Sequence, residues 1–475
     1  MNPARAVEEF YDVAVIGAGP AGLAAATVCA RAGLATALFD EQPGPGGQIY
    51  RAVAGTPLKR DTILGADYWR GASLVADCAA SGVHYLPNAT VWSLSPEREI
   101  GVSLAGVAHT IRARRVILAT GAIERPFPIP GWTLPGVMTV GAAQGLLKSA
   151  GLVPTGRVVL AGTGPLLWLF ARQCLAAGAE IASLLDTTPR GNIVRALPHA
   201  APFVASPYLG KGLALLQAVR PRNKIVRNVE ALAAEGSRRL AAVRFRTARG
   251  AEERIGADLL LLHQGVVPNV NLAMAAGVSH VWDDEQLCFV PTLSRDLASS
   301  IEGVAIAGDG GGIVGAEASA EQGRIAAFAA IRAIKPAEAA SLIGAEAEAR
   351  RNLARWRSGR RFLDRLYRPP DQFRIAEGDT IVCRCEEVKA HEISEAIALG
   401  CTGPNQLKAF TRCGMGPCQG RMCGLTVTEI IAAGRGVAPG DIGYYRLRPP
   451  VKPVTVGALA GLPAGDAATR AVVRE

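Results

Sequence analysis

The chain has 475 residues, and 51 Lys or Arg against 41 Asp or Glu give it a formal net charge of +10. Its length predicts several domains, and its 49% hydrophobic residues exclude a mostly disordered chain. The Arg residues are scattered without a basic block, so the charge does not indicate a nucleic-acid-binding protein. No apolar run approaches the ~18 residues that span a bilayer. We expect a soluble cytoplasmic protein, and attachment to a membrane surface stays open.

The first segment, from Asp12 to Asp40, predicts a strand, a glycine turn, a helix and a second strand. The turn is a GxGxxG motif in its proper context, after a strand and before a helix, which is typical of a dinucleotide site. We expect the dinucleotide to contact Gly17, Gly19, Pro20, Ala21 and Gly22. Asp40, 18 residues beyond the last glycine, and its neighbour Glu41 stand where a carboxylate binds ribose hydroxyls.

A second copy of this unit begins at Arg157, about 145 residues later. It keeps Gly162 and Gly164, but Leu167 replaces the third small residue and is expected to narrow the pyrophosphate slot. Asp186 is in place for a ribose. The sequence therefore predicts a Rossmann-like unit whose ligand stays open: NAD(P)H, another adenine nucleotide, or none.

Two further glycine turns follow predicted strands, ATG at 119–121 and AGD at 307–309. With the first unit, they resemble the two-dinucleotide flavoproteins with glutathione-reductase-like folds, over about residues 12–327. The resemblance implies an FAD site in which the later Asp binds the ribityl chain. The residues that it adds to the site are Gly47, Gln48, Thr120, Gly121, Gly308 and Asp309. Asp309 has an alternative interpretation as a helix N-cap.

The disulfide-reductase activity of that family is not expected, because the stretch directly after Asp40 (EQPGPGGQIYR) contains no cysteine and Cys174 has no near partner. Isolated cysteines in apolar surroundings are interpreted as buried hydrophobic residues: Cys29, Cys78, Cys174 and Cys288. A lone His263 at a strand end is interpreted as structural.

Six cysteines fall between Cys383 and Cys423, on glycine-rich segments suited to iron–sulfur or zinc binding. The strings CRCEEV and TRCGMGPCQGRMC resemble the bacterioferritin-associated-ferredoxin-like [2Fe-2S] domain. The resemblance implies the ligands Cys383, Cys385, Cys418 and Cys423. The last pair is C-x4-C instead of the short C-x-x-C, which leaves Cys413 as a substitute ligand; packing is the preferred interpretation of Cys401 and Cys413.

The order of these parts resembles the α (A) subunit of hetero-oligomeric amine and amino-acid dehydrogenases, including opine (octopine/nopaline) oxidases, D-hydroxyproline dehydrogenases and hydrogen cyanide synthase. The implied fold class is α/β, with two Rossmann-like units, a helical linker and a small [2Fe-2S] domain. The expected domains are an FAD domain in two parts (1–130 and 286–335), a degenerate NAD-like domain (131–285), a helical linker (336–375), the [2Fe-2S] domain (376–435) and an extended tail (436–475).

In that family a β-type FAD subunit oxidises the C–N bond, and the resemblance leaves open an interface FMN and a small γ subunit. We therefore expect an FAD-dependent electron-transfer subunit. The tail, with prolines between Arg448 and Pro453, is expected to clasp a neighbouring subunit. One alternative is a stand-alone NAD(P)H-dependent reductase with a fused [2Fe-2S] domain; another is a scaffold with vestigial sites.

Overall fold

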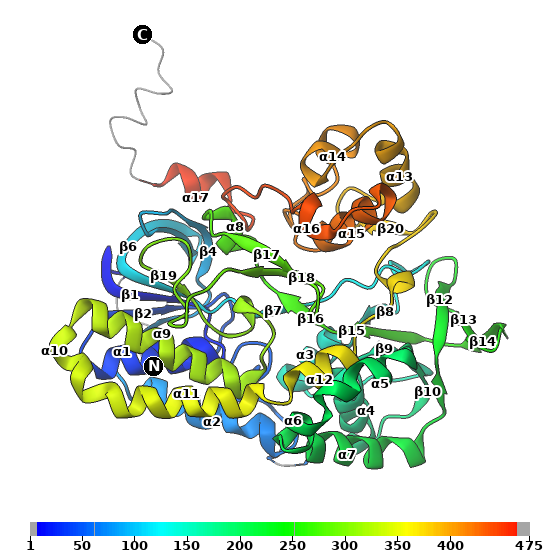
Figure 1. The fold of residues 1–475 in the computed structure, drawn as a ribbon, viewed down its shortest axis with the longest axis horizontal. Helices are drawn as coiled ribbons and strands as arrows, with labels where there is room; N and C mark the ends of the chain where they lie inside the picture. The colour runs from blue at the N-terminus through cyan, green and yellow to red at the C-terminus, as the bar shows by residue number, and fades with distance from the viewer. Residues whose placement is uncertain (1–6, 61, 251, 463–475) are drawn as a thin grey trace, which may run out of the picture.

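The computed structural model describes residues 7–60, 62–250 and 252–462. Two units with parallel sheets lie side by side, and a small Cys-rich unit sits over their junction (Figure 1). The expected α/β class is confirmed. Among the described residues, no helix has both the length and the apolar character to span a bilayer.

The first unit is built on a seven-stranded sheet. Its strands are β1 Phe10–Ile16, β2 Thr36–Phe39, β3 His84–Leu86, β4 Thr90–Leu94, β5 Glu99–Leu104, β6 Val107–Leu118 and β19 Val304–Ile306. The order is β3-β2-β1-β6-β5-β4, and β19 pairs with the end of β6. The strands β3, β2, β1, β6 and β19 are parallel, whereas β4 and β5 form an antiparallel meander with β6.

Alternation along β1 gives this sheet two apolar faces. Val13 and Val15 point into a core with the helices, whereas Ala14 and Ile16 point into a core with the meander. The helices and turns of this side are α1 Pro20–Arg31, α2 Ala66–Ala79, η3 Gly308–Gly311, α9 Ala316–Ile334, α10 Pro336–Ala339, η4 Ala340–Leu342 and α11 Ile343–Arg357. The expected helical linker thus packs along α9 at one side of the first unit (Figure 1).

The second unit repeats the plan around a five-stranded parallel sheet. Its strands are β8 Val137–Thr139, β9 Val158–Thr163, β10 Ile181–Asp186, β11 Ile225–Arg227 and β15 Leu259–Gln264, with the antiparallel strands β12 Val229–Glu235, β13 Ala242–Thr247 and β14 Glu252–Gly256 beside it. Its helices and turns are α3 Val140–Ala150, α4 Pro165–Ala176, α5 Gly191–Ala196, η1 Leu197–His199, α6 Ala200–Val204, α7 Pro207–Val219 and η2 Arg220–Arg222. The end of the linker, α12 Arg360–Leu366, packs on α5.

The chain crosses between the two units along one short ribbon, in which β7 Ala122–Glu124 pairs with β16 Val266–Pro268. After this crossing, α8 Asn271–Ala275, β17 His280–Asp283 and β18 Cys288–Pro291 follow. Leu272, Ala273 and Ala276 pack into the core of the first unit. The second part of the first unit therefore begins near residue 269. The sequence had predicted this boundary after residue 285. These three apolar residues are too few to show the periodicity of a strand or a helix, so the sequence could not predict that they pack into the core of the first unit.

The Cys-rich unit consists of η5 Asp371–Phe373, β20 Ile381–Cys383, β21 Val388–Lys389, α13 Ala390–Ala398, α14 Pro404–Thr411 and α15 Gly424–Arg435. The described part of the tail contains α16 Pro439–Ile442 and α17 Val456–Ala460. This described part returns along its own chain: Tyr445 is buried among the cysteines, and the N–H of Val451 donates to the carbonyl of Trp92 at 2.9 Å. Its apolar residues find their partners in this chain's own cores. The expected contact of the tail with a neighbouring subunit stays a prediction.

Candidate cofactor sites

The glycine turn of the first unit joins β1 to α1 so closely that two positions have no room for a side chain. A Cβ on Gly22 would lie 1.8 Å from the carbonyl oxygen of Gly17, and one on Gly17, at φ 105°, would lie 2.4 Å from that of Ala119. Gly19 is the N-cap of α1 and Pro20 its first residue. The turn therefore presents bare backbone and a helix N-terminus, which suits a pyrophosphate.

Asp40 lies at the end of β2 and is 7% exposed. Its Oδ2 accepts a hydrogen bond from the N–H of Ala18 at 2.5 Å, and its Oδ1 accepts one from Gln42 at 2.7 Å. Burial raises the pKa of Asp40, and the two backbone donors oppose that shift. Glu41 pairs with Lys452 of the tail at 2.6 Å. The carboxylate of Asp40 thus joins the glycine turn to the strand end; its contact with a ribose stays a prediction.

The loop after Asp40 folds back onto the glycine turn. The N–H of Gly46 donates to the carbonyl of Ala18 at 2.8 Å. A Cβ on Gly47, at φ 61°, would lie 2.8 Å from the Cα of Gly19. Two glycine-rich segments are therefore in backbone contact, as the predicted FAD site requires.

A buried lysine, which the sequence analysis missed, fixes this loop from the second unit. Lys148 on α3 is 4% exposed, and its Nζ donates to the carbonyls of Gln48 and Ile49 at 3.1 and 3.0 Å and to Gln144 Oε1 at 2.8 Å. Burial, together with the nearby charge of Arg51, lowers the pKa of Lys148 to about 7. The predicted flavin-side residue Gln48 is thus positioned by both units.

The ATG turn after β6 meets the turn after β19. The hydroxyl of Thr120 donates to the carbonyl of Asn269 at 3.1 Å. A Cβ on Gly310 would lie 3.1 Å from Thr120 Oγ1 and 3.5 Å from the N atom of Gly121. Both turns follow the carboxyl ends of neighbouring parallel strands, where nucleotides bind in open α/β sheets.

Gly308 and Asp309 complete this edge of the sheet. A Cβ on Gly308 would lie 2.9 Å from the Cβ of Ala21, so this turn contacts the start of α1. Asp309 Oδ1 accepts from the N–H groups of Val314 and Gly315 at 2.8 and 2.9 Å. Asp309 is therefore not the N-cap of α9, which is Gly315, although its carboxylate binds the two backbone N–H groups just before that helix. Binding of a ribityl chain by Asp309 stays a prediction.

The corresponding turn of the second unit packs closely against His263. A Cβ on Gly162 would lie 1.6 Å from the carbonyl oxygen of His263, and one on Gly164 would lie 3.1 Å from His263 Nε2. His263 is buried, and its Nδ1 lies 2.7 Å from Glu124 Oε1. The structural interpretation of His263 is therefore supported, and the histidine also adjoins the pyrophosphate position.

Leu167 is fully buried in the core beneath this turn. Asp186, at the end of β10, accepts from the N–H of Thr188 at 2.9 Å, and burial raises its pKa. The second unit thus has the fold of a nucleotide-binding unit, but Leu167, at the third position of its glycine motif, is part of the hydrophobic core. Its ligand stays open.

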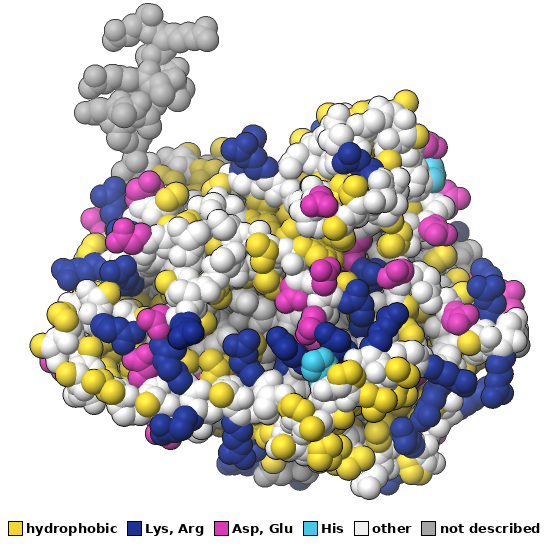
Figure 2. All heavy atoms as spheres, in the orientation of Figure 1, with side chains coloured by type: hydrophobic (Ala, Val, Ile, Leu, Met, Phe, Trp, Pro, Cys, Tyr) yellow, Lys and Arg dark blue, Asp and Glu magenta, His cyan; other side chains and the backbone are white. Residues whose placement is uncertain are grey.

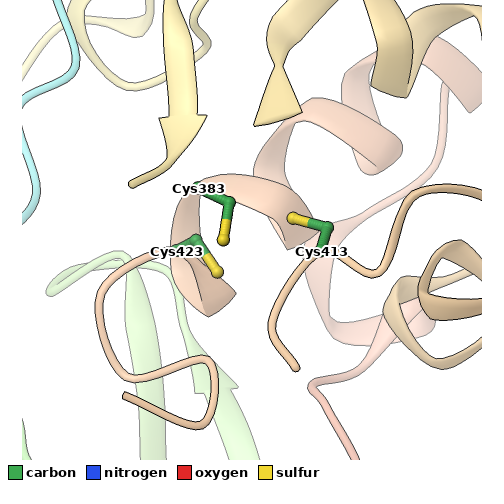
Figure 3. Close-up of side chains that lie close together, drawn as sticks. All are labelled: Cys383, Cys413 and Cys423. Carbon is green, nitrogen blue, oxygen red and sulfur yellow. The ribbon is translucent and has the colours of Figure 1, made fainter. Parts of the chain in front are cut away.

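Three thiols converge in the Cys-rich unit (Figure 3). The sulfur atoms of Cys383, Cys413 and Cys423 all lie within 4.8 Å of one another, and all three residues are buried. Hydrogen bonds from the thiols of Cys413 and Cys423 lower the pKa of Cys383 far below that of a free thiol. Hydrogen bonding with Cys383 raises the pKa of Cys413 and of Cys423 in turn. One of the three thiols, that of Cys383, is therefore favoured as the thiolate, which is the form that binds metal.

The other two predicted ligands form a second pair. The thiols of Cys385 and Cys418 are in hydrogen-bonding contact with each other. Burial raises the pKa of Cys385, and the nearby charge of Cys383 adds to that shift. A [2Fe-2S] cluster takes four thiolates. The four predicted ligands therefore lie as two pairs, Cys383 with Cys423 and Cys385 with Cys418; the ligand assignment and the cluster type stay predictions.

Cys413 differs from the expectation, because packing was its preferred interpretation and the structure places its sulfur with two predicted ligands. The hydroxyl of Tyr445 donates to Cys413 at 3.4 Å and lies 3.9 Å from Cys423 Sγ. Sequence spacing offered one signal, the long C-x4-C, but could not place the third thiol. Cys401 lies apart in a packing position, with its thiol 3.5 Å from the carbonyl of Gly403.

Buried polar contacts attach the Cys-rich unit to the rest of the chain. Trp132 Nε1 donates to the carbonyl of Ile381 at 2.7 Å, and Arg384 lies over the Trp132 ring at 5.2 Å. Arg125 and Arg374 both pair with Glu429, and burial lowers the pKa of each arginine. The thiol cluster is therefore held in place against both nucleotide-type units.

Family models match this architecture in two parts. Residues 11–323 match the pyridine nucleotide-disulphide oxidoreductase family, and residues 377–462 match the sarcosine oxidase A3 domain. The chain therefore belongs to the pyridine nucleotide-disulphide oxidoreductase family, a class of FAD-dependent oxidoreductases.

Curated relatives define the particular group. The chain is 47% identical to the A-type subunit of opine oxidase from Agrobacterium tumefaciens (strain Ach5), over 99% of this chain and 96% of the relative. It is 32% identical to hydrogen cyanide synthase subunit HcnB of Pseudomonas aeruginosa, over 94% and 98%. L-proline dehydrogenase from P. horikoshii shares the fold, with a TM-score of 0.67 and 19% identity over 95% and 79%. The chain belongs to this family of A-type oxidoreductase subunits that act on C–N donors, which confirms the expected family and enzyme class.

Proposed function

We propose that this chain is the electron-accepting subunit of a hetero-oligomeric dehydrogenase whose substrate is an opine, an amino acid with a secondary amine. A β-type FAD subunit oxidises the substrate's C–N bond, and this chain carries the electrons onward. One observation carries the proposal: the thiol cluster of Cys383, Cys413 and Cys423 lies in the same chain as an FAD-type unit, in a relative of the A-type opine oxidase subunit.

The two predicted cofactors divide the electron chemistry. Oxidising a C–N bond releases two electrons and two protons; a flavin accepts electrons in pairs, and a [2Fe-2S] cluster carries them singly. The chain's own residues would hold these groups. Bare glycine backbone and the start of α1 would bind the pyrophosphate, and Lys148 holds the loop that carries Gln48. The buried thiols would bind the iron.

The residues beside the FAD-type site support substrate oxidation in a partner. Arg51 is the cation of the flavin-side loop, and its guanidinium is already hydrogen-bonded to Gln42 Oε1 at 2.7 Å and Gln48 Oε1 at 2.8 Å. A guanidinium usually binds a carboxylate through two parallel N–H groups, and Arg51 already uses one N–H on each of its terminal nitrogens. An FMN at the subunit interface and a small γ subunit belong to the same proposal and would be found with the purified complex.

The test is to coexpress this chain with a β-type flavoprotein partner and assay octopine and nopaline oxidation with an artificial electron acceptor. The complex should oxidise an opine, and each chain purified alone should show less than a tenth of that rate. Acid extraction should release FAD from this chain. Opine oxidation by this chain alone at the rate of the complex would overturn the partner requirement, and rapid reduction by NADH would favour the stand-alone reductase.

A further inference from the structure

The tail brings a buried tyrosine to the thiol cluster. Tyr445 is 2% exposed, and its hydroxyl donates to Cys413 Sγ at 3.4 Å and lies 3.9 Å from Cys423 Sγ. Cys423 is a predicted cluster ligand, and Cys413 is its substitute. An O–H group is therefore directed at the sulfur atoms from outside the predicted ligand set.

Two glycines of the cysteine-rich segment make room for the Tyr445 ring. A Cβ on Gly414, at φ 83°, would lie 2.4 Å from Cζ of Tyr445, and one on Gly420, at φ 74°, would lie 2.5 Å from its Cδ2. Both glycines stand between Cys413 and Cys423 in the sequence. The segment that carries these thiols is thus shaped around this one ring.

Hydrogen bonds fix the backbone of Tyr445 on both sides. Before it, the carbonyl of Gly443 accepts from the hydroxyl of Thr428 on α15 at 2.8 Å. After it, the N–H of Arg446 donates to Asn405 Oδ1 on α14 at 2.7 Å. The hydroxyl therefore keeps its direction toward the sulfur atoms, because two helices of the Cys-rich unit hold the tyrosine in place.

A cation lies over the same ring. Lys408 Nζ is 4.8 Å from the centroid of the Tyr445 ring. A cation over a phenol draws electron density from the ring, which makes the hydroxyl a stronger donor. Figure 2 shows mostly uncharged side chains on the visible face of the Cys-rich unit. The hydroxyl and the amine thus act on the thiols with little competition from charges on that face.

We propose that Tyr445 raises the reduction potential of the cluster held by these cysteines, through the hydrogen bond from its hydroxyl to sulfur. The proposal rests on the iron–sulfur part of the proposed function. Reduction adds one electron to the cluster, and a donor at sulfur stabilises the added negative charge. The proton stays on the tyrosine oxygen, and no bond forms or breaks there. Tyr445 therefore makes the cluster a better acceptor for an electron from a reduced flavin.

The test is a redox titration of the purified complex, with the reduced cluster followed by paramagnetic resonance. Tyr445→Phe keeps the ring and removes the hydroxyl. It should lower the equilibrium constant for reduction at least threefold, which is about 28 mV at 59 mV per tenfold change for one electron. The matched control is Tyr444→Phe, because the hydroxyl of Tyr444 donates to the carbonyl of Gly420 at 3.3 Å. This control should keep the wild-type potential, and iron content shows that each variant holds its cluster.

A second variant covers the case in which Tyr445→Phe loses its iron. Lys408→Met keeps the hydroxyl and removes the cation over the ring, so it should also lower the potential. An unchanged potential in Lys408→Met would then overturn the proposal.

Equal potentials in wild type and in an iron-loaded Tyr445→Phe would overturn the proposal and leave the proposed function intact. An equal shift in Tyr444→Phe and Tyr445→Phe would also overturn it, because packing of the tail would then set the potential. A wild-type chain without an iron–sulfur cluster would refute both. A lowered potential in Tyr445→Phe alone, in a complex that oxidises no opine, would support this proposal and refute the proposed function.

Discussion

Lys148 gives the structure a measurable pH dependence. Its amine is buried beside the flavin-side loop, and its pKa is lowered from 10.5 to about 7, chiefly by burial. Between these two values the folded chain binds fewer protons at this site than the unfolded chain. The free energy of unfolding therefore rises with pH across this window, by about 1.4 kcal/mol per pH unit for one proton. The full shift corresponds to roughly 5 kcal/mol.

The perturbation is Lys148→Met, which keeps the length of the side chain and removes the titrating group. Between pH 7.5 and 9.5, the free energy of unfolding of the wild type should rise by about 3 kcal/mol relative to that of the variant, which is the pH dependence expected when one proton is lost. The assay is urea unfolding monitored by flavin release, which reports the unit that contains the loop. The variant should also release FAD at lower urea at pH 9.5, because the neutral amine of Lys148 still has two N–H groups for the carbonyls of Gln48 and Ile49, whereas a methionine side chain has none.

A matched control is Lys335→Met, because Lys335 also donates to two carbonyls, those of Ala32 and Gly33, at 3.1 and 2.9 Å, from a more exposed position. Its unfolding curve should keep the pH dependence of wild type. Parallel pH profiles for wild type and Lys148→Met would refute the reasoning, because they would show that Lys148 keeps its proton on burial.

Three further predictions concern the cofactors. The iron–sulfur absorbance should disappear when any one predicted ligand is changed to Ser, and it should survive in Cys401→Ser. The predicted ligands are Cys383, Cys385, Cys418 and Cys423. Full cluster occupancy in Cys418→Ser, together with loss of the cluster in Cys413→Ser, would show that Cys413 is the ligand. Gly22→Val should lose at least nine-tenths of the FAD, because its Cβ meets backbone at 1.8 Å, whereas Gly344→Ala, in open space, should keep it; normal FAD content in Gly22→Val would contradict the close approach. NADH should reduce the flavin slowly under anaerobic conditions, and full reduction by micromolar NADH within seconds would reject this.

Local sequence patterns predicted the parts of the site that are made by consecutive residues. The glycine turn from Gly17 to Gly22 follows its strand as expected, and the ATG and AGD turns lie at neighbouring strand ends. Each depends on backbone geometry that a short motif specifies. The α/β class was predictable for the same reason.

Parts that depend on distant partners were not predictable. Lys148 lies 100 residues from Gln48, and nothing in its helix marks it as buried. Cys413 was assigned to packing because spacing alone cannot show that its sulfur meets those of Cys383 and Cys423. The prolines of the tail exclude a regular helix there, but they could not show that Val451 donates to the carbonyl of Trp92, 359 residues earlier in the chain.

The most direct test of the electron-transfer role is paramagnetic resonance of the complex after anaerobic mixing with its opine substrate. The account predicts that the signal of a reduced [2Fe-2S] centre appears with substrate. It also predicts that the signal is absent when this chain is mixed with substrate alone, and that it is lost in Cys383→Ser while the partner's flavin is still reduced. An unchanged iron–sulfur centre in a wild-type complex whose flavins have been fully reduced by substrate would contradict the account.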